Sequence, residues 1–262
     1  MAFEDLQNDY TLGGAQQAVL SPAANACTFT QFERQDEAWL QKSHGADHFN
    51  GDFTHTFKLK LTAENGVYPM VLLWLLANQI DSWDDIRTEN DDTQDINIYV
   101  GKARLGVVED GVYRHSDTAN SLASDSTQYY ITVERDDDGG ANGTGQLTMR
   151  IHTVDYFGEA GSIELETETI DCSAGEQNDF QYFYPCNQYV TASLLSYYSG
   201  VCEDYNLHEG APPAGEPSRP PMFINIMTMS KLVLPFLFLV GCLRNPMLTD
   251  REKFNPLKWI KK

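Results

Sequence analysis

The chain has 262 residues, which is enough for one β-sandwich domain of about 200 residues with appended segments. Its 38 acidic and 18 basic side chains give a formal net charge of −20, and a field of this sign repels phosphate backbones and anionic lipid headgroups. Nucleic acid is therefore not expected as a partner, whereas a polysaccharide or a divalent cation is compatible with this charge.

The first half of the chain predicts β-strands after a short N-terminal extension. Residues 1–24 lack the positive start and apolar run of a secretory signal, so no N-terminal signal peptide is expected. Residues 52–62 alternate apolar and polar side chains, which predicts a strand with one buried face. Residues 68–78 are apolar throughout, as is typical of a strand covered on both faces.

An acidic segment follows at residues 81–95. Its carboxylates could supply the oxygen ligands that calcium prefers, and the candidate ligands are Asp84, Asp85, Asp91, Asp92 and Asp95. The segment does not fit an EF-hand pattern, and charged loops are usually only solvated. Calcium is therefore one interpretation of the segment, and a solvated loop is the other.

Residues 127–153 carry the strongest local signal in the sequence. Tyr129, Ile131 and Val133 share one face of a strand, and a second alternating run follows an acid- and glycine-rich loop at 136–143. This pattern predicts a β-hairpin. Further strands are predicted at 95–101, 104–111, 162–170, 179–185 and 199–209, and no helix is expected before residue 210.

The C-terminal part differs in composition from the rest of the chain. Residues 211–221 are proline-rich and predict an extended linker. Residues 222–243 are strongly apolar but contain Lys231, and a basic tail follows to residue 262. The apolar segment 222–243 fits either a single membrane anchor, with the basic tail on the inner side, or a segment that docks on protein, and a virion or membrane partner through 222–262 is possible. A third interpretation is a merged reading frame, because residues 229–242 resemble a lipoprotein signal.

Four cysteines lie in the predicted globular part: Cys27, Cys172, Cys186 and Cys202. None of them forms a closely spaced pair of the kind that holds zinc. Without a visible signal peptide, buried free thiols are favoured over disulfides such as Cys172–Cys186 or Cys27–Cys202.

The order of these strand patterns resembles a known family. The sequence DFTHTFKLKLT, then MVLLWLLAN, DINIYVG, YYITVERD, GQLTMRIHT and SGVCEDYNLHE is similar to the concanavalin A-like lectin and glucanase domains, particularly laminin-G-like versions found in bacteriophage and environmental sequences. The resemblance covers residues 25–210. It implies an all-β fold, a two-sheet antiparallel jelly-roll sandwich, whose concave face or rim loops bind glycans, sometimes with calcium.

Aromatic residues near predicted loops and strand ends are the candidates for contact with sugar rings. They are Trp83, Tyr113, Tyr156 and Trp39. Trp83 is favoured because it lies in the acidic segment, although a loop tryptophan is more often a hydrophobic plug than a stacking platform.

Three functions fit these observations. The first is a non-enzymatic lectin-like module that binds a glycan or polysaccharide at a virion or cell surface. The second is a structural virion subunit, a decoration or tail-associated protein, which docks through residues 211–262 on a virion or membrane partner. The third is a glycoside hydrolase that uses Glu164 and Glu168, because residues 162–170 resemble the E-x-D-x-E strand of laminarinase-type glucanases. Glu166 replaces the central aspartate of that motif, so no enzyme is expected.

Overall fold

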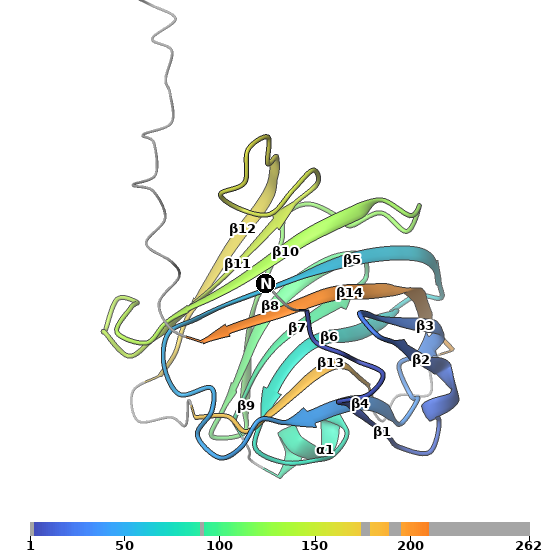
Figure 1. Ribbon diagram of the computed structural model, residues 1–262, viewed down its shortest axis with the longest axis horizontal. Coiled ribbons are helices and arrows are strands. Elements are labelled where there is room, and N and C mark those ends of the chain that lie inside the picture. The colour runs from blue at the N-terminus through green and yellow to red at the C-terminus, as the bar shows by residue number, and fades with distance from the viewer. Residues whose placement is uncertain (1–2, 90–91, 174–178, 189–194, 210–262) are drawn as a thin grey trace, which may run out of the picture. The chain divides into compact units, whose positions relative to one another are not determined.

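The computed structural model describes residues 3–89, 92–173, 179–188 and 195–209 (Figure 1). They form two antiparallel sheets of seven strands each, packed face to face around one large apolar core. The predicted linker at 211–221 and the segment 222–262 lie outside the described residues. Within the described part of the chain, no helix is long and apolar enough to span a membrane.

The two sheets are called sheet A and sheet B. Sheet A contains, in spatial order, β1 (Thr11–Gly13), β4 (Ala38–Ser43), β13 (Tyr182–Gln188), β6 (Met70–Ala77), β7 (Thr93–Tyr99), β8 (Lys102–Glu109) and β9 (Val112–Asp117). Sheet B contains β12 (Glu164–Asp171), β11 (Gln146–His152), β10 (Gln128–Asp136), β5 (Phe53–Asn65), β14 (Tyr197–Glu209), β3 (Ala26–Glu33) and β2 (Leu20–Ala23). A 3₁₀ turn, η1 (Gln17–Val19), precedes β2.

Sheet B confirms the alternation read from the sequence. In β5, Phe53, Phe57 and Leu59 are buried against sheet A, while the intervening side chains are half-buried on the outer face. The predicted hairpin is formed by β10 and β11, with Ile131 opposite Ile151 in the register. One face of each strand is therefore dry because it meets the other sheet.

Strand β6 is buried on both faces, as its apolar run predicts. Leu73 and Trp74 belong to the core between the sheets, whereas Leu72 and Leu75 belong to a second apolar cluster on the outer face of sheet A. A register shift between Leu72 and Trp74 accommodates the change of face.

The second apolar cluster is covered by a short helix, α1 (Trp83–Thr88), so the expectation of no helix before residue 210 is wrong. The Ser82 side chain caps the helix by accepting a hydrogen bond from the Asp85 backbone N–H at 3.4 Å. Asp84 and Asp85 lie in the first turn, where the helix dipole favours carboxylates. Part of the acidic segment is therefore helical instead of a solvated loop.

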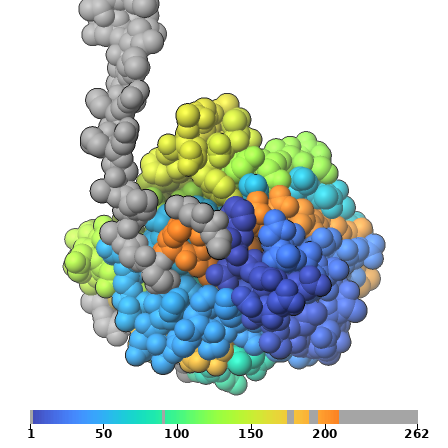
Figure 2. Space-filling view, in the orientation of Figure 1, coloured from blue at the N-terminus to red at the C-terminus, as the bar shows by residue number. Residues whose placement is uncertain are grey.

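The sandwich begins earlier than the predicted boundary at residue 25, because β1 and β2 lie within the expected extension and pair with β4 and β3. The Glu4 N–H also donates to the Tyr205 carbonyl of β14 at 2.9 Å. In the space-filling view the blue N-terminal segment lies beside the orange β14 (Figure 2). The expected boundary was too late because short edge strands carry little alternation.

The four cysteines of the sandwich are buried free thiols. Cys27 and Cys202 are opposite each other on β3 and β14. The Sγ atoms of Cys186 and Cys202 are 3.4 Å apart and join the inner faces of the two sheets. Cys172 lies apart from them, after β12, where its N–H donates to the Gly145 carbonyl at 2.8 Å.

Candidate functional site

A cavity of about 210 Å³ opens on the outer face of sheet A, beside α1. Its lining combines aromatic rings with guanidinium and amide groups: Arg34, Met70, Trp83, Arg87, Asn97, Tyr99, Arg104 and Tyr113. This set of residues is called the arginine–aromatic pocket below. It draws on β6 to β9, on α1, and on the connection between β3 and β4.

The register of sheet A explains why these side chains share one face. On β7, Ile96 and Ile98 point into the core, so Asn97 and Tyr99 point outward. Tyr99 is opposite Met70 on β6, and Asn97 is opposite Arg104 on β8. Neighbouring strands therefore place their pocket residues side by side.

Gly106 allows Tyr113 to reach the centre of the sheet. A Cβ atom on Gly106 would lie 2.6 Å from the Tyr113 ring and 2.9 Å from Asp95 Oδ1, so only glycine leaves room for the ring to cross β8. The Tyr113 hydroxyl then accepts a hydrogen bond from Asn97 Nδ2 at 2.8 Å and donates to Asp95 Oδ1 at 3.4 Å. The Asn97 amide also donates to Asp95 Oδ1 at 3.0 Å.

Trp83 is held in the pocket by both its backbone and its ring. Its N–H donates to Oδ1 of the buried Asn187 on β13 at 2.9 Å. Its ring meets Tyr113 edge to face, with centroids 5.4 Å apart and planes at 83°. Two of the predicted ligand residues, Trp83 and Tyr113, are therefore brought together although they are far apart in the sequence.

Three arginines lie over the aromatic rings of the pocket. The guanidinium carbon is 5.1 Å from the Trp83 centroid for Arg87, and 4.2 Å from the Tyr99 centroid for Arg104. Arg34 approaches the Tyr99 ring at 5.5 Å. These distances are within the range of cation–π attraction, which holds the guanidinium groups in place.

Burial controls the charges beneath the pocket. Asp95 is fully buried, which raises its carboxyl pKa to about 6, and the hydrogen bonds from Asn97 and Tyr113 oppose this rise only in part. Burial, and then the nearby Asp95 carboxylate, raise the pKa of the Tyr113 phenol. Tyr113 is therefore a neutral hydroxyl at physiological pH, suited to hydrogen bonding.

The other two predicted aromatic residues lie elsewhere. Tyr156 follows β11 and packs its ring edge-on against Tyr130 of sheet B, with centroids 5.1 Å apart. Trp39 lies on β4, where its indole covers Gly13 and packs against the apolar cluster of sheet A. Neither residue lines the arginine–aromatic pocket.

The predicted calcium ligands that the structure describes do not converge. Asp84 pairs with Arg87, with Oδ1 and Nη2 2.5 Å apart, and Asp85 contacts the capping Ser82. Asp92 accepts from the Asp110 N–H at 3.0 Å, and Asp95 lies beneath Tyr113. Asp91 lies outside the described residues, among which no group of three His, Cys, Asp or Glu side chains could hold a metal ion. Calcium binding stays a prediction.

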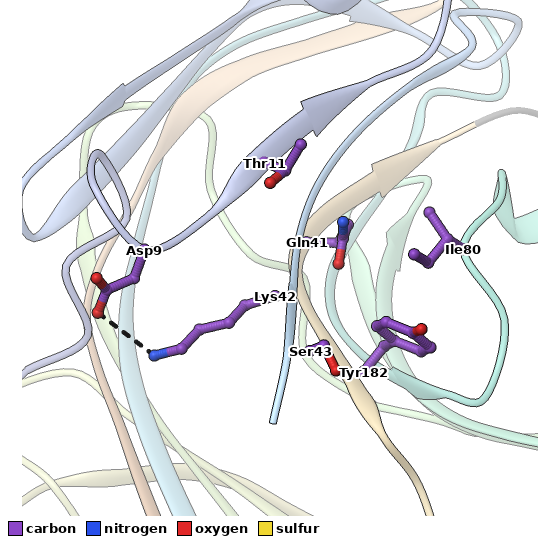
Figure 3. A pocket seen from close by; sticks show the side chains of 7 residues that line it. All are labelled: Asp9, Thr11, Gln41, Lys42, Ser43, Ile80 and Tyr182. Atoms are coloured by element: carbon purple, nitrogen blue, oxygen red, sulfur yellow. Dashed lines mark hydrogen bonds and ion pairs between the residues drawn. The ribbon is translucent and has the colours of Figure 1, made fainter. Parts of the chain in front are cut away.

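A second, larger cavity of about 450 Å³ lies near the opposite edge of sheet A, over β1, β4 and β13 (Figure 3). Figure 3 shows Lys42 extending toward Asp9, away from Gln41 and Tyr182. The Lys42 ammonium is 2.7 Å from Glu4 and 3.5 Å from Asp9. Its charge is thus already balanced, and Tyr182 is the one aromatic residue in the lining.

Two of the three glutamates of β12 tie sheet B to β9 of sheet A and to the residues that follow β9. Glu166 accepts hydrogen bonds from the N–H groups of Ala119 and Asn120 at 3.0 and 3.1 Å, and Glu168 accepts from the Ser116 hydroxyl. Glu164 lies 3.9 Å from His152. These carboxylates do not line either cavity described above.

Most residues of the pocket were not predicted from the sequence: Arg34, Met70, Arg87, Asn97, Tyr99 and Arg104. One signal was available. Glycine inside a strand often marks a close approach of another group, and Gly106 interrupts the apolar run of β8. The outward positions of β7 were also readable from the alternation around Ile96 and Ile98. No local pattern, however, indicates that Arg34 reaches β7.

Comparison with known proteins gives similarity in structure alone. No family model matches the chain, and no curated protein matches it. A structure of botulinum neurotoxin type C is similar with a TM-score of 0.50 and 10% identity, over 80% of this chain and 47% of that one. The LG1–3 region of the laminin α2 chain has a TM-score of 0.44 and 14% identity, over 70% and 31%. An alginate lyase has a TM-score of 0.48 and 9% identity, over 76% and 86%.

The chain thus spans about a third of the laminin region and about half of the neurotoxin structure that it matches. The similarity to the neurotoxin structure and the pair of seven-stranded antiparallel sheets described above show that the chain has a two-sheet jelly-roll sandwich fold.

Proposed function

We propose that this protein is a carbohydrate-binding module and that the arginine–aromatic pocket holds the glycan. The observation that carries the proposal is the convergence of Trp83, Tyr99 and Tyr113 around one cavity. Aromatic rings offer flat apolar faces for the C–H groups of a sugar ring. The buried Asn97 amide and the neutral Tyr113 hydroxyl supply hydrogen-bonding groups that orient the ring.

The size of the cavity supports a small ligand group. A volume of about 210 Å³ is below the usual range for drug-sized ligands, about 300–1,000 Å³, so we expect it to hold one sugar unit of a longer chain. The larger cavity is a weaker candidate because its lysine is already paired and it has one aromatic side chain.

The structural similarity to a ganglioside-dependent neurotoxin is consistent with the proposal, but the proposal rests on the pocket itself. Cell entry of botulinum neurotoxin type C, whose structure is similar to this chain, depends on interaction with two ganglioside molecules. At 10% identity, this neurotoxin shares a fold with this chain, and its ligand does not transfer to it.

The experiment is a glycan array probed with the full chain, with calcium and again with chelator, followed by titration of each bound glycan. In the pocket, Tyr99→Ala should weaken binding at least about tenfold because a stacking surface is lost. The matched control is Tyr182→Ala in the larger cavity, which should keep affinity within about twofold. The melting temperature of each variant checks that it is folded.

Three results decide the proposal. If no glycan binds the folded full chain, the function is wrong. If Tyr182→Ala abolishes binding and Tyr99→Ala does not, the site is the larger cavity. If chelator abolishes binding, calcium is required, and the acidic segment at 81–95 is the first place to seek its ligands.

A further inference from the structure

The arginine–aromatic pocket concentrates positive charge in a strongly acidic protein. Six arginines occur in residues 3–209, and three of them line this one cavity. They come from separate parts of the fold: Arg34 after β3, Arg87 from α1 and Arg104 from β8. The formal net charge of the chain is −20, so this local gathering of guanidinium groups runs against the overall field.

Two of the three guanidinium charges are balanced within the protein. Arg87 pairs with Asp84, with Nη2 and Oδ1 2.5 Å apart. Arg104 pairs with Asp117, with Nε and Oδ1 2.7 Å apart. These side chains can still donate hydrogen bonds to a ligand, but their net charge is already offset.

Arg34 is the exception. Within the described residues it forms no ion pair, and its buried Nε has no hydrogen-bond partner. Its contact in the pocket is the Tyr99 ring, 5.5 Å from the guanidinium carbon. Tyr99 is also contacted by Arg104, so one aromatic ring positions two guanidinium groups beside the cavity. A half-buried guanidinium without a counter-charge favours an anion supplied from outside.

From this imbalance we infer that the pocket takes a saccharide bearing a carboxylate, with Arg34 as the group that pairs with it. The inference rests on the proposed glycan-binding function and specifies its ligand class. The planar guanidinium fork matches a carboxylate in two parallel hydrogen bonds. The sugar ring then lies against the aromatic rings. The Asn97 carbonyl oxygen and the Tyr113 hydroxyl oxygen accept from its hydroxyls, because the protons of both side chains are already donated within the protein.

One unbalanced guanidinium suits one negative charge on each sugar ring. A heavily sulfated ring carries more charge than Arg34 can balance, and Asp84 and Asp117 lie beside the other two arginines. The acidic residues elsewhere oppose an anion less, because fields between exposed charges fade beyond about 8 Å at physiological ionic strength. A uronic acid is therefore the expected class, in preference to a polysulfated sugar.

The test compares uronate oligosaccharides with their carboxyl-reduced counterparts, which keep the same sugar ring and linkage without the charge. Oligomers of galacturonate, mannuronate and glucuronate, each with its reduced form, and a heparin oligosaccharide are titrated calorimetrically against the full chain. At least one uronate oligosaccharide should bind at least about ten times more tightly than its carboxyl-reduced form. The heparin oligosaccharide should bind more weakly than that uronate.

The variant Arg34→Gln separates charge from shape. It should remove the preference for the uronate, bringing the affinities for the acid and reduced forms within about twofold of each other. The matched control is Arg150→Gln on sheet B, where Arg150 pairs with Glu134 at 3.2 Å. This control should keep the full preference for the uronate.

The outcomes separate this inference from the proposed function. If uronates bind no better than reduced forms, if heparin binds most tightly, or if Arg34→Gln keeps the preference, the assignment of a carboxylate is wrong. In that case the proposed function survives provided that a glycan binds and Tyr99→Ala weakens it. If no glycan of either kind binds the folded chain, both fail.

Discussion

Replacing the buried carboxyl of Asp95 should stabilise the protein at neutral and alkaline pH. Asp95 is fully buried under Tyr113, and its pKa rises from the usual 3.8 to about 6 on folding. The folded state therefore binds the proton more tightly than the unfolded state, so stability falls as the pH rises from about 4 to 6. At about 1.4 kcal/mol for each tenfold change in proton affinity, the charged carboxylate costs about 3 kcal/mol above that window.

Asp95→Asn keeps an oxygen that can accept hydrogen bonds from Asn97 and Tyr113, and it never ionises. We expect the variant to be more stable than the natural protein by up to about 3 kcal/mol near pH 8, and by less than about 1 kcal/mol near pH 4. Urea unfolding of both proteins across this pH range measures the difference. Because the difference is taken at each pH, other titrating groups cancel.

Asp125→Asn is the matched control with the opposite sign. Its exposed carboxylate accepts from the Thr127 hydroxyl at 2.6 Å, and this hydrogen bond lowers its pKa. A lowered carboxyl pKa stabilises the folded state above about pH 4, so this variant should lose stability at neutral pH. A constant stability difference for Asp95→Asn from acid to alkaline pH would refute the reasoning about its burial.

Three further predictions concern the core. Tyr205→Phe should lower the free energy of unfolding by about 1–3 kcal/mol, because the single proton of the buried hydroxyl is shared between the Leu73 and Pro185 carbonyls of sheet A. Urea unfolding measures this free energy, and an unchanged value would show that this hydrogen bond adds nothing to stability. Gly200→Ala should lower the free energy of unfolding by about 1–3 kcal/mol, because the added Cβ would collide with the Lys60 carbonyl oxygen. An unchanged melting temperature would contradict this close approach of Gly200 to the Lys60 carbonyl. In a Cys242→Ser chain, no thiol should react with an aromatic disulfide reagent in the folded state, because the four thiols of the sandwich are buried. All four should react once denaturant is added. Reaction of any thiol in the folded state would mean that this thiol is accessible.

The strands that lie between the two faces of the sandwich could be predicted from sequence because their burial has a short period. In β5 and β10, alternate residues meet the opposite sheet, and the alternation is visible without any knowledge of pairing. Strand β6 was predictable for the complementary reason, since both of its faces are covered. Strands β1 and β2 were not, because short edge strands at the margin of the sandwich bury few side chains.

Helix α1 was missed although its start is marked. Ser82 followed three residues later by Asp85 is an N-terminal capping pattern, and the two side chains do contact each other. The many acidic residues of this segment favour a metal-binding interpretation, which does not consider Ser82 as a helix N-cap. The helix is only six residues long, so periodicity gave no help.

The candidate site could be predicted only in part. Trp83 and Tyr113 were chosen individually, but their contact depends on the register of β7, β8 and β9 and on the gap at Gly106. The sequence predicts Asp95 as a metal ligand because it ends an acidic run, whereas its position in β7 places it under the Tyr113 ring. Such non-local pairings are set by the whole sheet, and a sequence window does not contain them.

The alternation along β7 separates residues that hold the two sheets together from residues that line the pocket. Ile96 and Ile98 face the shared core, while Asn97 and Tyr99 face the pocket one residue away. Substitutions at the outward positions can change what the surface recognises without disturbing how the two sheets pack. If the proposed function holds, a lineage carrying this sandwich can thus acquire new sugar preferences through Asn97 and Tyr99, while Ile96 and Ile98 preserve the fold.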